Sequence, residues 1–179
     1  MSLSRIREQF ANNIEHSMKA AELLPEGISA AGNMLVAALL DGGRLYLSGQ
    51  AAGALISAHM AAQLLGSEQG SRPPLPAQYL RDQQSATLLR AFAQRQDVLL
   101  LINPDHAMAE PLLQAARDRD MRVILICSVD SAQAASLIGD RDLCLMLPGE
   151  HTNRLAETAL LVAHALCDHI EQQLFGDLL

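Results

Sequence analysis

The apolar residues at the start of the chain recur every three or four positions, which is the spacing of an amphipathic helix. They are Leu3, Ile6, Phe10, Ile14, Met18, Ala21 and Leu24. Pro25 and Gly27 interrupt this pattern. A second helix is predicted from residue 28 to about residue 40, because Asp41-Gly42-Gly43 is a strong stop signal. The first 43 residues therefore predict a helical hairpin.

After residue 43 the pattern changes to short, almost continuous apolar runs separated by helical segments. Strands are predicted at 44–48, 97–102, 122–127 and 142–147, with a weaker one near 77–80, and helices at 54–65, 107–119, 132–138 and 152–175. Apolar strands between helices are typical of a parallel sheet that is covered on both faces. The prediction is an α/β fold with a doubly wound parallel sheet of four to five strands and a long C-terminal helix.

Length and composition limit the classes of protein. A chain of 179 residues fits one domain, which we divide into N-terminal helices (1–43), an α/β core (44–150) and a C-terminal helix (151–179). Half of the residues are hydrophobic, which excludes wholesale disorder. Only 3% are aromatic and the net charge is −7, so direct nucleic-acid binding is disfavoured.

The cysteines and the apolar runs give weaker signals. Cys127, Cys144 and Cys167 include no CxxC pair, so their spacing predicts neither a zinc site nor a disulfide framework, and small buried thiols in a reducing compartment are expected. The N-terminus carries no hydrophobic signal core, and the longest apolar run, residues 34–40, is too short to span a bilayer. We expect a cytoplasmic protein with no membrane partner, no metal and no cofactor.

Candidate ligand-binding residues follow two of the predicted strands. In doubly wound sheets, ligands gather beyond the carboxyl ends of the strands, where helix N-termini favour anions. The candidates are Ser48, Gln50, Ala51, Ala52, Gly53, Asn103 and Asp105. The first loop lacks the glycine patterns of nucleotide-binding proteins, so a plain strand-to-helix turn is the alternative interpretation.

Several peptides resemble the sugar isomerase (SIS) domain family. Within it, the chain is most similar to the phosphoheptose isomerases and to the DiaA-type proteins that associate with the replication initiator DnaA. The resemblance covers nearly the whole chain and is carried by residues 39–45, the Gly49 loop with His59 ten residues later, and residues 72–77, 139–142, 166–170 and 174–175.

The resemblance implies site residues, and the chain departs from the family pattern at several of them. The isomerases use a His and a Glu one helical turn apart, plus a Gln and a His on the last helix, and that set can bind zinc. His59 and His164 match the two histidines, and they are the residual catalytic candidates. Gln63 replaces the Glu and Ala156 replaces the Gln, which leaves two separated imidazoles without a carboxylate, a poor zinc set.

The loops depart from the family as well. The first usually reads close to Gly-Asn-Gly-Gly-Ser and the second is a Ser/Thr-rich phosphate cradle. The hydroxyl of the first loop is replaced by Gly53, while Pro104 removes an amide donor from the second and Asp105 puts a carboxylate where phosphate would lie. The segment after Leu80 is also about fifteen residues shorter than in the relatives. These losses argue against phosphate binding.

These features are compatible with three functions. The departures favour a non-catalytic homo-oligomer of DiaA type that binds DnaA and regulates replication initiation. The resemblance implies that it is a tetramer built from the N-terminal helices and the last helix. Leu174 and Phe175 are its partner-binding candidates, because large apolar groups at a chain end often mark a contact. Packing within the protein is the alternative interpretation. The other two functions are isomerisation of sedoheptulose 7-phosphate, with His164 as acid and base, and sensing of a sugar phosphate.

Overall fold

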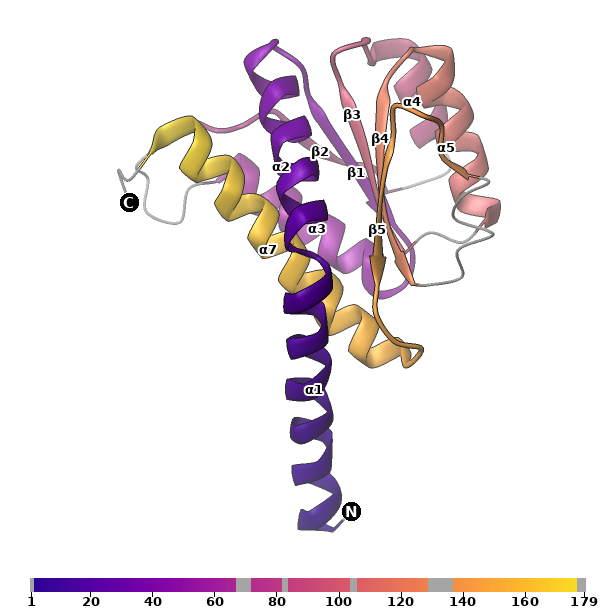
Figure 1. Cartoon of the computed structure of the whole chain (residues 1–179). Helices are drawn as coiled ribbons and strands as arrows, with labels where there is room; N and C mark the ends of the chain where they lie inside the picture. The colour runs from indigo at the N-terminus through magenta and orange to yellow at the C-terminus, as the bar shows by residue number, and fades with distance from the viewer. Residues whose placement is uncertain (1, 67–71, 82–83, 104–105, 129–136, 177–179) are drawn as a thin grey trace.

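A five-stranded parallel sheet forms the centre of the computed structural model, which describes residues 2–66, 72–81, 84–103, 106–128 and 137–176 (Figure 1). The strands are β1 (Leu45–Gly49), β2 (Ala77–Tyr79), β3 (Val98–Ile102), β4 (Arg122–Ser128) and β5 (Leu143–Leu147), in the order β2-β1-β3-β4-β5. All neighbouring strands pair in parallel. The predicted doubly wound α/β fold is confirmed.

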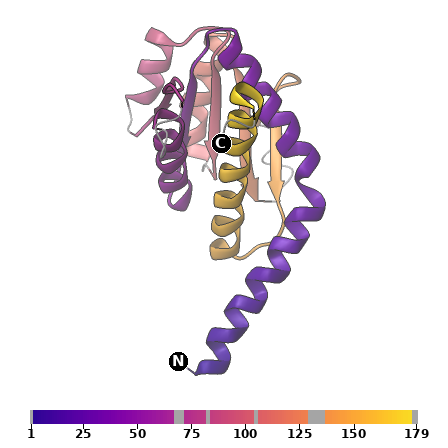
Figure 2. The ribbon, with the colours of Figure 1, turned by 90° about the vertical axis from the view of Figure 1, so that its left-hand side faces the viewer.

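Helices cover both faces of the sheet. On one face lie α2 (Pro25–Leu40), α3 (Ala52–Leu65) and α7 (Thr152–Phe175), and on the other lie α4 (Ser85–Phe92) and α5 (His106–Asp118) (Figures 1 and 2). The central strand β3 is fully buried, with Val98, Leu100 and Ile102 in the first apolar cluster and Leu99 and Leu101 in the second. This double burial explains why its sequence is a continuous apolar run.

The two N-terminal helices do not form the predicted hairpin. α1 (Leu3–Leu23) and α2 meet at an angle of 66°, and α1 projects away from the sheet (Figures 1 and 2). Pro25 occupies the first turn of α2, a position where its missing amide proton costs nothing. The chain therefore bends between the helices without the loop that a reversal needs, and the hairpin prediction is wrong.

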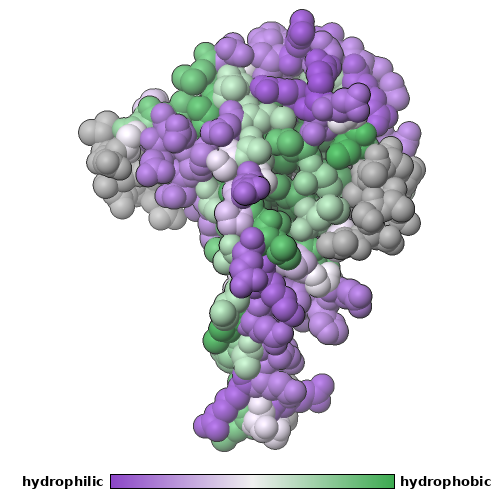
Figure 3. Space-filling view, in the orientation of Figure 1, coloured by the Kyte–Doolittle hydropathy of each residue, from purple (hydrophilic) through white to green (hydrophobic). Residues whose placement is uncertain are grey.

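The projecting helix leaves its apolar residues uncovered. Ala20 is the one buried residue that the structure describes in α1, whereas Leu3, Phe10, Ile14 and Met18 are all exposed. We call these four the α1 stripe, and hydrophobic patches are visible along one side of the helix in Figure 3. An apolar stripe of this kind on a projecting helix indicates a surface that is covered by a partner.

Other differences from the predicted elements are local. The short helix α4 was not predicted, and the predicted helix at 132–138 falls largely outside the described residues. Within the described part of the chain, no single helix combines the length and apolar character needed to cross a membrane, although the bent pair α1 and α2 together meets both criteria.

The strand order creates one point of divergence in the sheet. From β1 the chain moves outward to β2, and it then returns to place β3 on the other side of β1. The segments that leave the carboxyl ends of β1 and β3, at Gly49 and Ile102, therefore run to opposite faces. This switch point is where ligands bind in open α/β sheets.

Candidate functional site

Two histidines from distant parts of the chain meet between α3 and α7. The Nε2 atoms of His59 and His164 lie 3.0 Å apart, and the rings contact edge to face at a centroid distance of 5.2 Å. Both imidazoles are exposed on the surface of the chain. The expectation of two separated imidazoles is wrong, because the packing of α3 against α7 brings together residues 105 positions apart.

This contact fixes how the two rings share protons. One Nε2 must carry a proton and the other must present its lone pair. When both rings are neutral, the donor ring has a bare Nδ1 and the acceptor ring carries its proton on Nδ1. The His59–His164 pair therefore combines one basic nitrogen with a hydrogen bond through which the gained positive charge is shared. That arrangement suits proton transfer to and from a substrate.

Gln63 adds a polar group beside this pair. It follows His59 by one helical turn on α3, so the two side chains share a face of the helix. Its Oε1 atom is buried and has no hydrogen-bond partner in the described part of the chain. An amide can accept a hydrogen bond from a hydroxyl but cannot take up a proton as a carboxylate does. Gln63 therefore cannot replace the family's carboxylate as a catalytic base.

Exposed leucines lie one helical turn before each histidine. Leu55 precedes His59 by one turn of α3, and Leu160 and Leu161 precede His164 by one turn of α7. Their exposed fractions range from 37% to 76%, which is high for leucine in a folded chain. Exposed apolar side chains therefore flank the histidine pair on the side toward the N-termini of α3 and α7.

A small cavity lies at the switch point. Its volume is about 30 Å³, and its lining comes from the first turns of α3 and α7 together with the loop after β3. The lining includes Ala51, Ala52, Gly53, Asn103 and Thr152, with apolar groups completing the wall. A volume of this size holds about two water molecules. A ligand larger than these must lie partly outside the cavity.

The backbone at this cavity is strained at two non-glycine residues. Ala51 has a φ of 50° and Asn103 has a φ of 47°, in the left-handed region that favours glycine. Gly53 is needed for a different reason, because a Cβ atom there would collide with the carbonyl group of Ile102. The loop and the strand end are therefore held in close contact. Strain of this kind clusters at functional sites.

The remaining sequence-predicted ligand residues occupy different environments. Ser48 is buried, and its hydroxyl donates to the carbonyl of Leu80 at 3.0 Å. This side chain therefore has a structural hydrogen bond within the core. Gln50 lies exposed at the mouth of the loop. Asp105 and Pro104 lie outside the described residues.

Leu174 and Phe175 contact the body of their own chain. Both are half-buried and pack against the apolar cluster beneath α2, α3 and α7. The Phe175 ring lies 5.9 Å from the guanidinium carbon of Arg72, in a cation–π contact. Arg72 in turn binds Glu171 on α7 and the carbonyl of Gln63. These contacts give the two residues a packing role at the end of α7.

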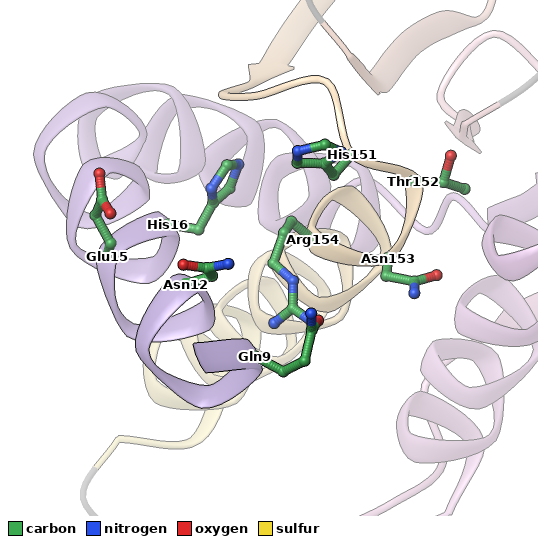
Figure 4. Close-up of a pocket in the computed structure, with 8 residues that line it drawn as sticks. All are labelled: Gln9, Asn12, Glu15, His16, His151, Thr152, Asn153 and Arg154. Atoms are coloured by element: carbon green, nitrogen blue, oxygen red, sulfur yellow. The ribbon is translucent and has the colours of Figure 1, made fainter. Parts of the chain in front are cut away.

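A larger polar cavity, which sequence reasoning missed, lies between α1 and the start of α7 (Figure 4). Its volume is about 490 Å³, and its lining residues are Gln9, Asn12, Glu15, His16, His151, Thr152, Asn153 and Arg154. The charged groups in it are paired, since Arg154 binds Glu157 and Gln9 while Glu15 binds Lys19. The residues that line the cavity come from two segments more than 130 positions apart in the sequence, so no local motif predicts it.

The zinc set of the isomerases does not fit this chain. The histidine pair supplies two nitrogen ligands, whereas a zinc ion in proteins takes at least three protein ligands. Over the described ranges, no group of three or more His, Cys, Asp or Glu side chains is arranged to hold a metal ion. Any proton transfer at this site is therefore assigned to the two imidazoles.

Comparison with known proteins shows the family. Residues 9–128 match the model of the SIS domain, and the chain belongs to this family. It is 33% identical to a phosphoheptose isomerase of Shewanella loihica, over 97% of this chain and 96% of that protein. A phosphoheptose isomerase of Chromohalobacter salexigens is 34% identical, with the same coverage.

Solved structures agree with this placement. A phosphoheptose isomerase from Francisella tularensis superposes with a TM-score of 0.89 at 26% identity, covering 96% of this chain and 99% of that one. The phosphoheptose isomerase GmhA from Neisseria gonorrhoeae superposes with a TM-score of 0.84 at 27% identity, covering 94% and 98%. The similarity extends over essentially the whole length of each protein.

These comparisons overturn the favoured functional prediction. The chain was expected to be a non-catalytic DiaA-type protein that binds DnaA, and that prediction is wrong, since the similar proteins are phosphoheptose isomerases. The altered loop residues and Gln63 are local departures, whereas the similarity to the isomerases extends over the whole chain. The enzymatic alternative is the better supported one.

Proposed function

We propose that this chain is a sugar-phosphate isomerase of the phosphoheptose isomerase type, which interconverts sedoheptulose 7-phosphate and its aldose isomer. The observation that carries the proposal is the 3.0 Å contact between His59 and His164, in a chain whose fold and sequence match those isomerases. The contact supplies a proton-transfer group that survives the loss of the family's carboxylate.

The proposed reaction needs one group that moves a proton between neighbouring carbons. The bare Nδ1 of the donor histidine removes the proton from the hydroxyl-bearing carbon next to the carbonyl, which leaves an enediolate with its negative charge on the former carbonyl oxygen. The imidazolium shares its charge with the second ring through the Nε2 contact. The proton of the neighbouring hydroxyl passes to that oxygen, and the same nitrogen returns its proton to the former carbonyl carbon, which completes the exchange of ketose and aldose.

The phosphate end is proposed to lie toward the switch point. His59 lies seven residues beyond Ala52, the first residue of α3, which corresponds to about 10 Å along the helix. That separation is comparable to an extended seven-carbon sugar. The positive end of the α3 dipole then favours the phosphate, while Gln50 and Asn103 border the path between them.

Self-association is part of the proposal. The exposed leucines around the histidines and the α1 stripe are two apolar surfaces that a second copy would cover. A homotetramer would bury both surfaces, with each subunit a single SIS domain over residues 1–179. Covering the leucines would also exclude water from the histidine pair, which strengthens electrostatic interactions with the substrate.

A second candidate function is sensing of a sugar phosphate without turnover. The observation that favours it is Gln63, because an amide at this position cannot take up a proton as the family's carboxylate does. Ligand binding would then be retained while isomerisation is lost.

Turnover of sedoheptulose 7-phosphate by the purified protein tests the proposal. We expect His164→Gln and His59→Gln each to lower kcat by 100-fold or more, within the range for general acid–base groups. His151→Gln is the matched control, since His151 lies at the start of α7 but away from the pair. Binding of the sugar phosphate without turnover would support the sensing function. Neither binding nor turnover would overturn both.

A further inference from the structure

Two cysteines that lie 17 positions apart in the sequence contact each other on the face of the sheet opposite the histidine pair. The Sγ atoms of Cys127 on β4 and Cys144 on β5 are 3.8 Å apart, within hydrogen-bonding range for sulfur. Both side chains are half-buried beside the apolar cluster beneath α4 and α5. Cys167, by contrast, is buried on the inner face of α7. The structure thus separates one paired, partly exposed dithiol from one inert thiol.

The contact shifts the pKa values of the two thiols in opposite directions. A hydrogen bond from the Cys127 thiol lowers the pKa of Cys144, because it stabilises the Cys144 thiolate. The same hydrogen bond, together with burial and the neighbouring thiolate, raises the pKa of Cys127. Cys144 therefore ionises first, and Cys127 remains its proton donor. The thiolate is the form of cysteine that reacts.

Sheet geometry opposes a disulfide between these two residues. In the parallel register, Cys144 pairs with Leu125 and Cys127 pairs with Met146, so the cysteines are diagonal neighbours. Strand spacing and rise put their Cα atoms about 8 Å apart, beyond the roughly 7 Å that a disulfide spans without backbone movement. A mixed disulfide formed at Cys144 would therefore not be resolved by Cys127.

We propose that Cys144 is a site of S-thiolation by small disulfides of the glutathione disulfide class, with Cys127 as the residue that positions and activates it. The Cys144 thiolate attacks one sulfur of the small disulfide. A new S–S bond forms to Cys144, the old S–S bond breaks, and the departing thiolate takes a proton from solvent. β5 is an edge strand, so the added group can extend from the side of the sheet.

The test is incubation of the reduced native protein with glutathione disulfide, followed by intact mass and peptide mapping. We expect one added glutathione per chain, at Cys144, and none in Cys144→Ser. Cys167→Ser serves as the matched control and should react like the wild type. Modification at Cys127 or Cys167, or an internal disulfide as the product, would overturn the proposal.

Two variants of Cys127 separate activation from a merely structural effect. Cys127→Ala removes the proton donor and should slow modification of Cys144 at neutral pH by about threefold or more, because less thiolate is present. Cys127→Ser keeps a hydroxyl donor and should restore the rate. Equal rates for both variants and the wild type would refute the role of Cys127. Circular dichroism of each variant checks that it has folded.

Discussion

Arg72 joins the two helices that carry the histidine pair, and its removal should destabilise the protein more than any exposed arginine would. Its side chain is 3% exposed, and it binds Glu171 on α7 at 2.5 Å. It also donates to the carbonyls of Gln63 and Leu64 at the end of α3, at 2.8 and 3.0 Å. Arg72→Met would keep an aliphatic stem of similar reach but leave these three partners unmatched.

The expected loss follows from the burial of this pair. Removing one member of a buried ion pair costs about 3–5 kcal/mol. Since Glu171 remains 25% exposed and can be partly hydrated, the lower value of about 3 kcal/mol applies. For a chain of this length, that corresponds to a fall in Tm of roughly 6–12 °C.

Urea denaturation of Arg72→Met and of Arg90→Met measures the difference. Arg90 forms an ion pair with Asp118 in which both side chains are more than 40% exposed, so its loss should cost at most about 1 kcal/mol. A loss below 1 kcal/mol for Arg72→Met, or equal losses for the two variants, would refute the reasoning.

Three further predictions test the loop, the buried thiol and the α1 stripe. Ala51→Gly should raise the free energy of unfolding by about 1 kcal/mol, since glycine relieves the strain at positive φ, whereas Ala52→Gly should lower it. Denaturant curves measure both values, and a lower free energy of unfolding in both variants would contradict the strain at Ala51. Burial raises the pKa of Cys167 to about 12. Between the ordinary pKa of 9.0 and 12 the unfolded state therefore binds fewer protons than the folded state, so the free energy of unfolding should fall as pH rises, and less steeply in Cys167→Ala. Equal slopes of this free energy against pH in the variant and the wild type would exclude the contribution. Phe10→Glu should reduce the assembly mass measured by light scattering while Arg7→Ala does not, and an unchanged mass would remove the α1 stripe from the interface.

The hydrophobic pattern predicted the sheet well because strands that are covered on both faces appear in the sequence as short continuous apolar runs. The run at 97–102 became β3, with both faces covered, and the stripe at 152–175 became the single helix α7. The pattern predicts a helix break at Pro25, whereas Pro25 begins α2. Local sequence does not encode the 66° bend between α1 and α2, because that angle depends on what each helix packs against.

The candidate site was only partly predictable, because its contacts join distant segments. His59 and His164 were identified individually, but their contact depends on the packing of α3 against α7. The contact between Cys127 and Cys144 depends on the pairing of β4 with β5 and has no spacing signal. Ser48 was predicted to bind a ligand but donates its hydroxyl proton within the core. The residue types indicated which side chains could transfer protons or react as thiols, but tertiary packing determines which of them are in contact.

The central claim is that the His59–His164 pair transfers a proton at a sugar carbon, and solvent exchange in D₂O tests it most directly. The protein is incubated with sedoheptulose 7-phosphate, and the sugar is followed by proton NMR and mass spectrometry. Because the sugar must enter from solvent and leave again, the imidazole protons exchange with solvent between turnovers, when no sugar covers the pair. The account predicts conversion to the aldose with deuterium incorporated next to the carbonyl, lost in His164→Gln and retained in His151→Gln. Sugar that stays unconverted and undeuterated with the wild type would contradict it.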